Sequence, residues 1–269
     1  MRIAFLGGGN MATALIGGLV AKGTDARSIA VIEVSPAARE RLGARYPVHI
    51  ATAPDAAMQK ADTVVLAVKP QDMRAALSGL PGNLKHQLVI SIAAGIPLDA
   101  LSRWLGGHRK LVRCMPNTPA LIGAGIAALY ALPEVDSQEK KKAESILRAV
   151  GEVVWVAEER LLDPVTAVSA SGPAYVFWFI EQLAASAEKL GLPPDVSMKL
   201  ALHTVLGAAK LAASSSEPPA SLRKNVTSKG GTTEAALNVF DEERIAERFA
   251  RALEAASRRA TELGRELGK

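Results

Sequence analysis

A glycine-rich loop near the start of the chain has the residue types and spacing that bind a dinucleotide. The segment from Phe5 to Ala12 reads FLGGGNMA, so that Gly7, Gly9 and Ala12 fit the pattern G-x-G-x-x-G/A. In this pattern the first glycine permits a tight turn, the second lets the backbone approach a pyrophosphate, and the third small residue packs the helix against the strand. An ordinary glycine turn is the alternative. The apolar run before the loop and the helical stretch after it favour a phosphate site at a helix start near Asn10.

The residues after the next apolar run indicate the type of dinucleotide, but some favour NAD and others favour NADP. Glu33 lies near the position where an acidic residue accepts a hydrogen bond from the ribose 2′-hydroxyl of NAD. Ser35, Arg39 and Arg41 follow, and a hydroxyl and guanidinium groups suit the 2′-phosphate of NADP. The two arginines could equally lie on a solvated helix face. We predict NADPH as the cofactor, with NADH as the alternative.

Three later segments combine proline, glycine and small residues at the ends of predicted strands: Val68–Pro70, Ser91–Gly95 and Arg113–Pro119. Ligands of open α/β sheets bind at the carboxyl ends of the strands. We therefore expect these segments to form a floor for the nicotinamide, although any one of them alone would be an ordinary loop.

A second candidate site lies far along the chain, where Gly230 and Gly231 precede Thr232 and Thr233. Two glycines and two threonines at a helix start present backbone N–H groups beside hydroxyls, which makes a nest for a small carboxylate. Capping of the helix by Thr233 is compatible with the same position. Ser171, just before Pro173, has the pattern of a helix cap, and capping is a sufficient explanation for it.

Other chemistries find little support in the sequence. The four histidines, at positions 49, 86, 108 and 203, lack the spacing of metal ligands, and we expect no metal. We find no Ser-His-Asp or Cys-His pattern. The net charge of +5 is spread along the chain, and the last helical stretch alternates Glu with Arg, so we expect no nucleic-acid partner.

The apolar runs that must position the first site alternate with helical stretches up to about residue 155. They lack a period of two, as strands buried on both faces do. We predict an α/β fold with a Rossmann-type doubly wound sheet. The predicted strands are Ile3–Leu6, Ile29–Val34, Thr63–Val68, Leu88–Ile92, Leu111–Met115, Gly125–Leu129 and Glu152–Val156.

After Asp163 the pattern becomes helical throughout, with predicted helices over Pro173–Leu190, Pro194–Ala213, Ser221–Lys229 and Thr233–Leu267. The first two are apolar on more than one face and need cover, which a second subunit in a two-fold dimer would supply; a self-sufficient small bundle is the alternative. We expect a dinucleotide-binding domain over residues 1–160 and an all-α dimerisation and substrate-binding domain over residues 161–269.

The single cysteine, Cys114, excludes an internal disulfide framework and suits a reducing compartment. We expect no run to approach the roughly 18–20 uncharged apolar residues of a membrane helix, and no signal peptide before Ile3. The expected location is the cytoplasm.

Taken together, the motifs resemble those of the pyrroline-5-carboxylate reductase family, in order and over essentially the whole chain. The resemblance rests on the glycine loop, AVKP at 67–70, AAG at 93–95, MPNTP at 115–119, SGPAY at 171–175 and GGTT at 230–233. The long segment from Pro219 to Asp241 is similar to the family's signature. Lys229 stands where proline is common in the family, Ala170 where glycine is common, and Glu33 where an uncharged residue is usual.

The resemblance implies reduction of the cyclic imine 1-pyrroline-5-carboxylate to L-proline by hydride transfer from NAD(P)H. It implies a cofactor site formed by Leu6, Gly7, Gly8, Gly9, Asn10, Met11, Ser35, Ala67, Val68, Lys69, Pro70, Ala93, Ala94, Gly95, Asn117 and Asn225. It implies a substrate site formed by Gly230, Gly231, Thr232, Thr233, Ser171 and Glu159. It also implies a homo-oligomer in which the helical domains interlock, with a ring of dimers as a further expectation.

An imine is basic enough to enter the site protonated, so Thr233 need only hydrogen-bond and orient the ring nitrogen. Two other functions remain open at this point. A related dehydrogenase would act on a hydroxy acid, with Lys69 as its acid, or on another cyclic imine. A non-catalytic sensor would bind NAD(P)H without turnover.

Overall fold

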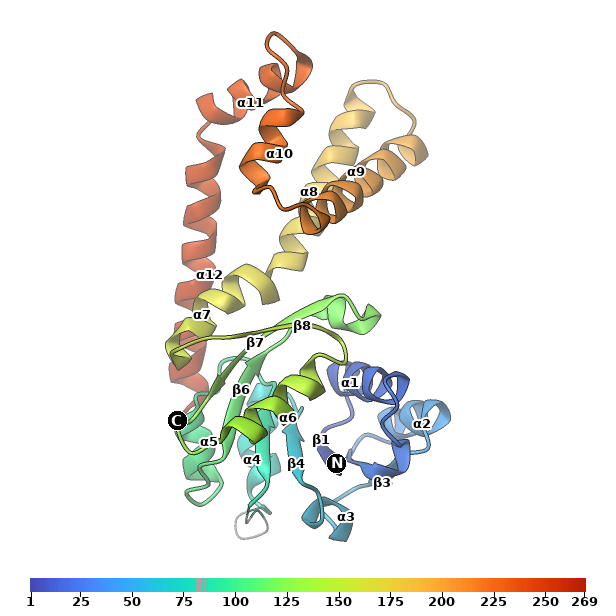
Figure 1. Cartoon of the computed structure of the whole chain (residues 1–269), viewed down its shortest axis with the longest axis vertical. Coiled ribbons are helices and arrows are strands. Elements are labelled where there is room, and N and C mark those ends of the chain that lie inside the picture. Colours follow the sequence, from blue (N-terminus) through green and yellow to red (C-terminus); the bar gives the residue numbers. More distant parts are fainter. Residues whose placement is uncertain (81–83, 85) are drawn as a thin grey trace. The chain divides into compact units, whose positions relative to one another are not determined.

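The computed structural model describes residues 1–80, 84 and 86–269, which form two compact units (Figure 1). The first unit contains Met1–Ser171 together with Glu254–Lys269, and the second contains Gly172–Leu253. The boundary predicted from the sequence, between residues 160 and 161, differs from these units because residues 161–171 and the end of the last helix pack with the first unit.

A mostly parallel sheet forms the centre of the first unit. In the described part of the chain its strands follow the order β3-β2-β1-β4-β5-β6-β7-β8, and β7 runs antiparallel to β6. The strands are β1 Ile3–Leu6, β2 Ile29–Ile32, β3 His49–Ala51, β4 Thr63–Leu66, β5 Leu88–Ser91, β6 Leu111–Met115, β7 Gly125–Ala131 and β8 Gly151–Trp155. The predicted doubly wound sheet is confirmed. The short edge strand β3 was not predicted, because three residues with little burial leave no apolar run.

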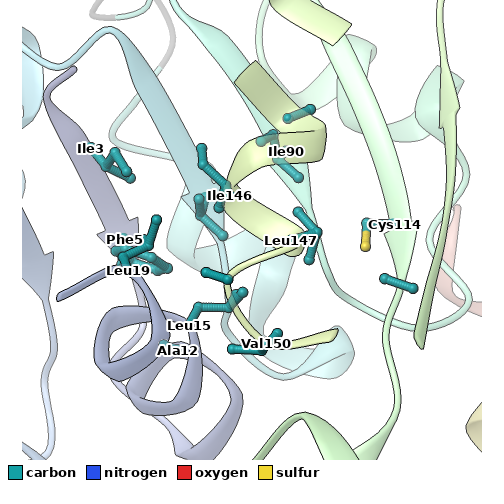
Figure 2. Close-up of a cluster of buried hydrophobic side chains, with 14 of the residues drawn as sticks. Ile3, Phe5, Ala12, Leu15, Leu19, Ile90, Cys114, Ile146, Leu147 and Val150 are labelled. Carbon is teal, nitrogen blue, oxygen red and sulfur yellow. The ribbon is translucent and has the colours of Figure 1, made fainter. Parts of the chain in front are cut away.

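Helices cover both faces of this sheet: α1 Asn10–Ala21, α2 Pro36–Arg45, α3 Ala56–Gln59, α4 Met73–Leu77, α5 Leu98–Trp104, α6 Ser137–Leu147 and α7 Leu162–Val165. Successive residues of β1 face opposite sides, so that Phe5 joins the core under α1 and α6 while Leu6 joins the core under α4 and α5. Figure 2 shows the first of these cores, with Leu15 and Leu147 on the helices that cover it. Burial on both faces explains why the strands lack a polar alternation.

The second unit is built from α8 Gly172–Lys189, α9 Pro194–Ser214, α10 Pro219–Asn225, α11 Thr232–Glu242 and the first part of α12 Ile245–Leu267. The predicted single helix over Thr233–Leu267 is wrong: Arg244, with φ 53°, interrupts it between α11 and α12. The sequence does not indicate this helix break, because a non-glycine residue at positive φ is uncommon and no glycine or proline lies at the break.

Large apolar side chains on α8 and α9 are exposed in the single chain although the two helices pack against each other. They include Val176, Phe177, Trp178, Phe179, Met198, Leu200, Leu202, Leu206 and Leu211. So many exposed large apolar side chains on two adjacent helices indicate an interaction site.

Helix α9 is also long and apolar enough to cross a membrane, with a mean hydropathy of 1.2. The helix contains Asp195, Lys199 and Lys210, so it does not contradict the expectation that no run approaches 18–20 uncharged apolar residues. Length and composition alone do not separate such a span from a helix that a partner subunit covers, because both need an apolar surface on several faces.

The helix starts predicted from serine and threonine side chains differ from the observed ones. Ser171 has helical backbone angles, φ −83° and ψ −22°, and follows the π-helical turn Thr166–Ala170, so it does not cap α8 from an extended conformation. The N-cap of α11 is Gly231, which places Thr232 and Thr233 in the first helical turn. The predicted capping roles of Ser171 and Thr233 are therefore wrong.

The core predicts how the single thiol behaves. Complete burial raises the pKa of the Cys114 thiol far above its usual range, because no water or cation stabilises a thiolate there. We expect iodoacetamide to leave Cys114 of the native protein unmodified at pH 8, and to alkylate it promptly in concentrated urea. Mass spectrometry of both samples provides the measurement. Equal labelling of native and denatured protein would contradict the buried position.

Candidate cofactor and substrate sites

A cleft of about 510 Å³ opens at the carboxyl ends of the first strands. It lies where the strand order reverses between β1 and β4, which is the ligand position of doubly wound sheets. Its lining comes from the segments that end four strands and from α4 with the residue before it: Leu6, Gly7, Gly9, Ile32, Glu33, Val34, Thr52, Ala53, Pro54, Ala67, Val68, Lys69, Asp72, Ala75 and Ala76.

Gly7 is required by the backbone of the cleft. Its φ is +100°, and a Cβ placed there would lie 2.7 Å from the carbonyl oxygen of Ala67. The N–H of Gly7 donates a hydrogen bond to the carbonyl of Ile32 at 2.8 Å. The loop is thereby fixed against both neighbouring strand ends, as the glycine pattern predicts.

Gly9 provides room for the ligand. A Cβ built on Gly9 would meet nothing within 4 Å, and this residue is the N-cap of α1 with no side-chain hydrogen bond to the first turn. The N–H groups of that turn are therefore open to an anion. An extended cleft with an open helix start and bare backbone beside it fits a dinucleotide pyrophosphate.

The cleft contains only part of the predicted cofactor site. Leu6, Gly7, Gly9, Ala67, Val68 and Lys69 line it. Asn10 and Met11 form the first turn of α1, and Pro70 follows Lys69 directly. Sequence reasoning missed Thr52, Ala53 and Pro54, because they follow the short strand β3, which has no recognisable pattern.

Two predicted cofactor residues beside the cleft have structural hydrogen bonds. The N–H of Gly8 donates to the carboxylate of Glu33 at 2.7 Å. Ser35 is the N-cap residue of α2, and its hydroxyl accepts a hydrogen bond from the N–H of Ala38 at 3.4 Å.

The turn Ala93–Gly95 and Asn117, which were predicted to support the nicotinamide, both lie in the first unit. A Cβ on Gly95, with φ +77°, would lie 3.3 Å from Leu267 of α12, so the turn packs closely on the last helix. The amide of Asn117 donates to the carbonyl of Ser169 at 3.2 Å and accepts from the N–H of Ile126 at 3.0 Å. These bonds give Asn117 a structural role at the end of β6.

Glu159, predicted to lie near the substrate, is the centre of an ion-pair cluster. Its Oε1 accepts from Arg113 at 3.0 Å and from the N–H of Leu98, at the start of α5, at 2.8 Å. Arg113 also lies 3.6 Å from Asp163, whose carboxylate accepts from the hydroxyl of Thr261 on α12 at 2.8 Å. The cluster joins the sheet, α5, α7 and α12, and the sequence did not indicate it.

The predicted carboxylate nest belongs to the second unit. Gly230 has φ 73°, and a Cβ on Gly231 would lie 2.5 Å from the hydroxyl of Ser228, so both glycines are needed for this turn. Gly231 begins α11 with no side-chain cap, which leaves first-turn N–H groups open beside the hydroxyl of Thr233. The N–H of Gly230 is not one of them, because it donates to the Glu234 carboxylate at 2.6 Å.

The amide of Asn225, on the preceding helix α10, donates to Glu217 at 2.9 Å within the same unit. Among the described residues, no group of three or more His, Cys, Asp or Glu side chains is arranged to hold a metal ion.

Comparison with known proteins identifies the family of this chain. A family model described as pyrroline-5-carboxylate reductase dimerisation matches residues 159–263, and one described as NADP oxidoreductase, coenzyme F420-dependent, matches residues 2–95. A pyrroline-5-carboxylate reductase of Pseudomonas aeruginosa is 45% identical over 269 residues, which covers 100% of this chain and 98% of the relative. The chain belongs to the pyrroline-5-carboxylate reductase family.

Solved structures from the family have the same fold. A pyrroline-5-carboxylate reductase from Coxiella burnetii superposes with a TM-score of 0.93 at 42% identity, covering 97% of this chain and 98% of that chain. A pyrroline carboxylate reductase of Plasmodium falciparum with NADP bound gives a TM-score of 0.85 at 28% identity, covering 98% of each chain.

The family resemblance, the fold class and the NAD(P)H-dependent oxidoreductase class predicted from the sequence are confirmed. The match of the helical region to a dimerisation model supports the predicted homo-oligomer.

The two glycines of the cleft predict different outcomes for the same substitution. Gly7→Ala should lower the melting temperature and abolish NAD(P)H binding, because the new methyl group meets the backbone of Ala67 at a positive φ. Gly9→Ala should fold normally but weaken NAD(P)H binding at least about tenfold, because its methyl group occupies the pyrophosphate approach. Thermal unfolding and fluorescence titration distinguish the two. A Gly9→Ala protein with unchanged affinity would contradict the assignment of this loop.

The ion-pair cluster predicts a large loss of stability on truncation. Arg113→Ala leaves two carboxylates without their buried partner, and we expect it to lower the free energy of unfolding by about 3–5 kcal/mol. The matched control is Arg103→Ala, whose partner Asp99 is exposed and which should cost at most about 1 kcal/mol. Urea unfolding at one fixed protein concentration measures both. Equal effects of the two substitutions would contradict a structural role for the cluster.

Proposed function

We propose that this chain reduces 1-pyrroline-5-carboxylate to L-proline with NAD(P)H, the last step of proline biosynthesis. The observation that carries the proposal is the open helix start at Gly231–Thr233, a carboxylate nest with a hydroxyl beside it, in a chain whose first unit has a dinucleotide cleft. A hydroxy-acid dehydrogenase would need a side-chain acid or base for its alcohol. The residues of the nest provide none, and Lys69, the candidate for that role, lines the cofactor cleft.

When bound, NAD(P)H supplies a hydride to the carbon of the substrate C=N bond. The chain's own residues hold the reactants. Gly7, Gly9 and the start of α1 bind the pyrophosphate, and the strand-end segments at 67–70 and 93–95 support the remainder of the cofactor. Gly231, Thr232 and Thr233 bind the substrate carboxylate through backbone N–H groups.

Thr233 orients the ring nitrogen through its hydroxyl. The imine nitrogen already carries its proton, so addition of the hydride to carbon gives the secondary amine with no further proton from a side chain. Thr233 accepts a hydrogen bond from that N–H, and the bond fixes the ring relative to the cofactor. Gly230, Ser171 and Asn225 complete the surroundings of the two ligands. Glu159 acts at a distance, by holding Arg113 and the start of α5 in place.

The proposed organisation follows from the same features. Residues 1–160 hold the cofactor, and residues 161–269 hold the substrate and form a homodimer through the apolar faces of α8 and α9, with a ring of dimers as the larger assembly. The chain works in the cytoplasm without nucleic-acid or membrane partners. Its single buried cysteine is compatible with a reducing compartment.

The direct test follows NADPH and NADH oxidation by absorbance with pyrroline-5-carboxylate as substrate. A six-membered cyclic imine and a hydroxy-acid pair serve as controls. We expect rapid oxidation of the reduced cofactor with the five-membered imine. We expect no oxidation with the keto acid of the hydroxy-acid pair. Cofactor binding without turnover would overturn the proposal and leave a sensor.

Substitution of Thr233 tests the proposed mechanism. Thr233→Ala should lower kcat roughly 10²–10³-fold, by analogy with the loss of an oriented hydrogen-bonding group in other enzymes. Thr233→Ser, which keeps the hydroxyl, should retain most of the activity. Nucleotide affinity, measured separately, should be the same in both variants. Near-normal turnover of Thr233→Ala would remove this role.

A further inference from the structure

The Glu33 carboxylate lies at the edge of the cofactor cleft, just after β2, and is fixed by two backbone N–H groups. Its Oε2 accepts from Gly8 at 2.7 Å, and its Oε1 accepts from Ser35 at 2.7 Å. The side chain lines the cleft and is half-buried. Because both oxygens are held, the negative charge stays at this edge and does not move freely with solvent.

This position is the one where a doubly wound dinucleotide site receives the adenosine ribose. A carboxylate only accepts hydrogen bonds, and its two oxygens have capacity left after one N–H each. It therefore suits the hydroxyl groups of an unphosphorylated ribose. A 2′-phosphate, which carries about −1.5 to −2 charges near neutral pH, would meet a like charge there. It would also find the N–H groups of Gly8 and Ser35 already used.

The arginines and the hydroxyl that follow Glu33 do not form an evident 2′-phosphate site. The guanidinium of Arg39 donates to the backbone carbonyls of Glu33 at 3.1 Å and Val34 at 2.8 Å. Arg41 is two residues further along α2, so it does not share a helix face with Arg39. The hydroxyl of Ser35 caps α2.

We propose that Glu33 is the residue that sets cofactor preference in this chain, favouring NADH by accepting the ribose hydroxyls and weakening NADPH by opposing its 2′-phosphate. Lys69, exposed at the rim of the same cleft, retains NADPH as a weaker ligand. The inference rests on the proposed function only in placing the cofactor in this cleft, and it concerns binding, which is measurable without substrate.

The test compares the full-length protein with its Glu33→Gln and Glu33→Ser variants by calorimetric titration. The probes are NADH, NADPH, 5′-ADP and 2′,5′-ADP. Both variants should lower the ratio of the Kd for NADPH to that for NADH by roughly 10- to 100-fold, the range of one charge-assisted hydrogen bond gained or lost. The two adenosine fragments should change in the same direction, because the discrimination arises at the ribose.

Asp72→Asn is the matched control, since it removes another carboxylate that lines the same cleft. It should change the ratio less than about threefold, whereas an equal change would assign the effect to the overall charge of the cleft and overturn the specific role of Glu33. Melting temperatures identify variants whose loop has lost its structure, and Glu33→Ser avoids the unfavourable donor pairing that a glutamine amide introduces.

The outcomes separate this inference from the proposed function. An unchanged ratio in both Glu33 variants would overturn the inference, whether or not the protein reduces pyrroline-5-carboxylate. A shifted ratio in a protein that does not turn over the imine would support the role of Glu33 and remove the reductase function.

Discussion

The close approach of two backbone segments, at Gly7 and Ala67, is the constraint on which the cofactor cleft depends. A Cβ on Gly7 would lie 2.7 Å from the Ala67 carbonyl, so the loops after β1 and β4 can meet only because the side chain is absent. These are the two strands between which the sheet reverses its order. Their contact brings the loop after β1 and the lysine-proline segment after β4 to one edge, and it leaves the start of α1 open for a phosphate.

The two units differ in how much of their apolar surface they bury within the single chain. In the first, helices cover both faces of the sheet and bury its central strands, and the cluster around Arg113 fixes the end of α12 to this sheet. In the second, α8 and α9 leave large side chains such as Phe177 and Trp178 exposed in the single chain. The match to a dimerisation model supports homo-oligomer formation, and cover by a second copy is the use that we propose for these faces.

The sequence predicted the elements whose signal is local. Seven of the strands were predicted because continuous apolar runs between glycine and proline signals are readable without any partner. The misses are equally specific. Strand β3 is too short to show a pattern of apolar residues. The helix break at Arg244 depends on a positive φ that its residue type does not predict. Gly231, not a hydroxyl side chain, begins α11, because the turn before it requires two glycines.

The fold class and the family were predictable without a structure, since each depends on residue types in a fixed order along the chain, and the same order indicates two candidate ligand segments. Only the tertiary structure decided which side chains are free to act. Glu33, Arg39 and Ser35 are compatible by residue type with either nucleotide, and the structure adds the hydrogen bonds that each makes at this edge of the sheet. Glu159 similarly has the charge of a substrate ligand, yet it is paired with Arg113, 46 positions away in the chain. Hydrogen-bond partners distant in sequence are brought together by packing, and no local pattern records them.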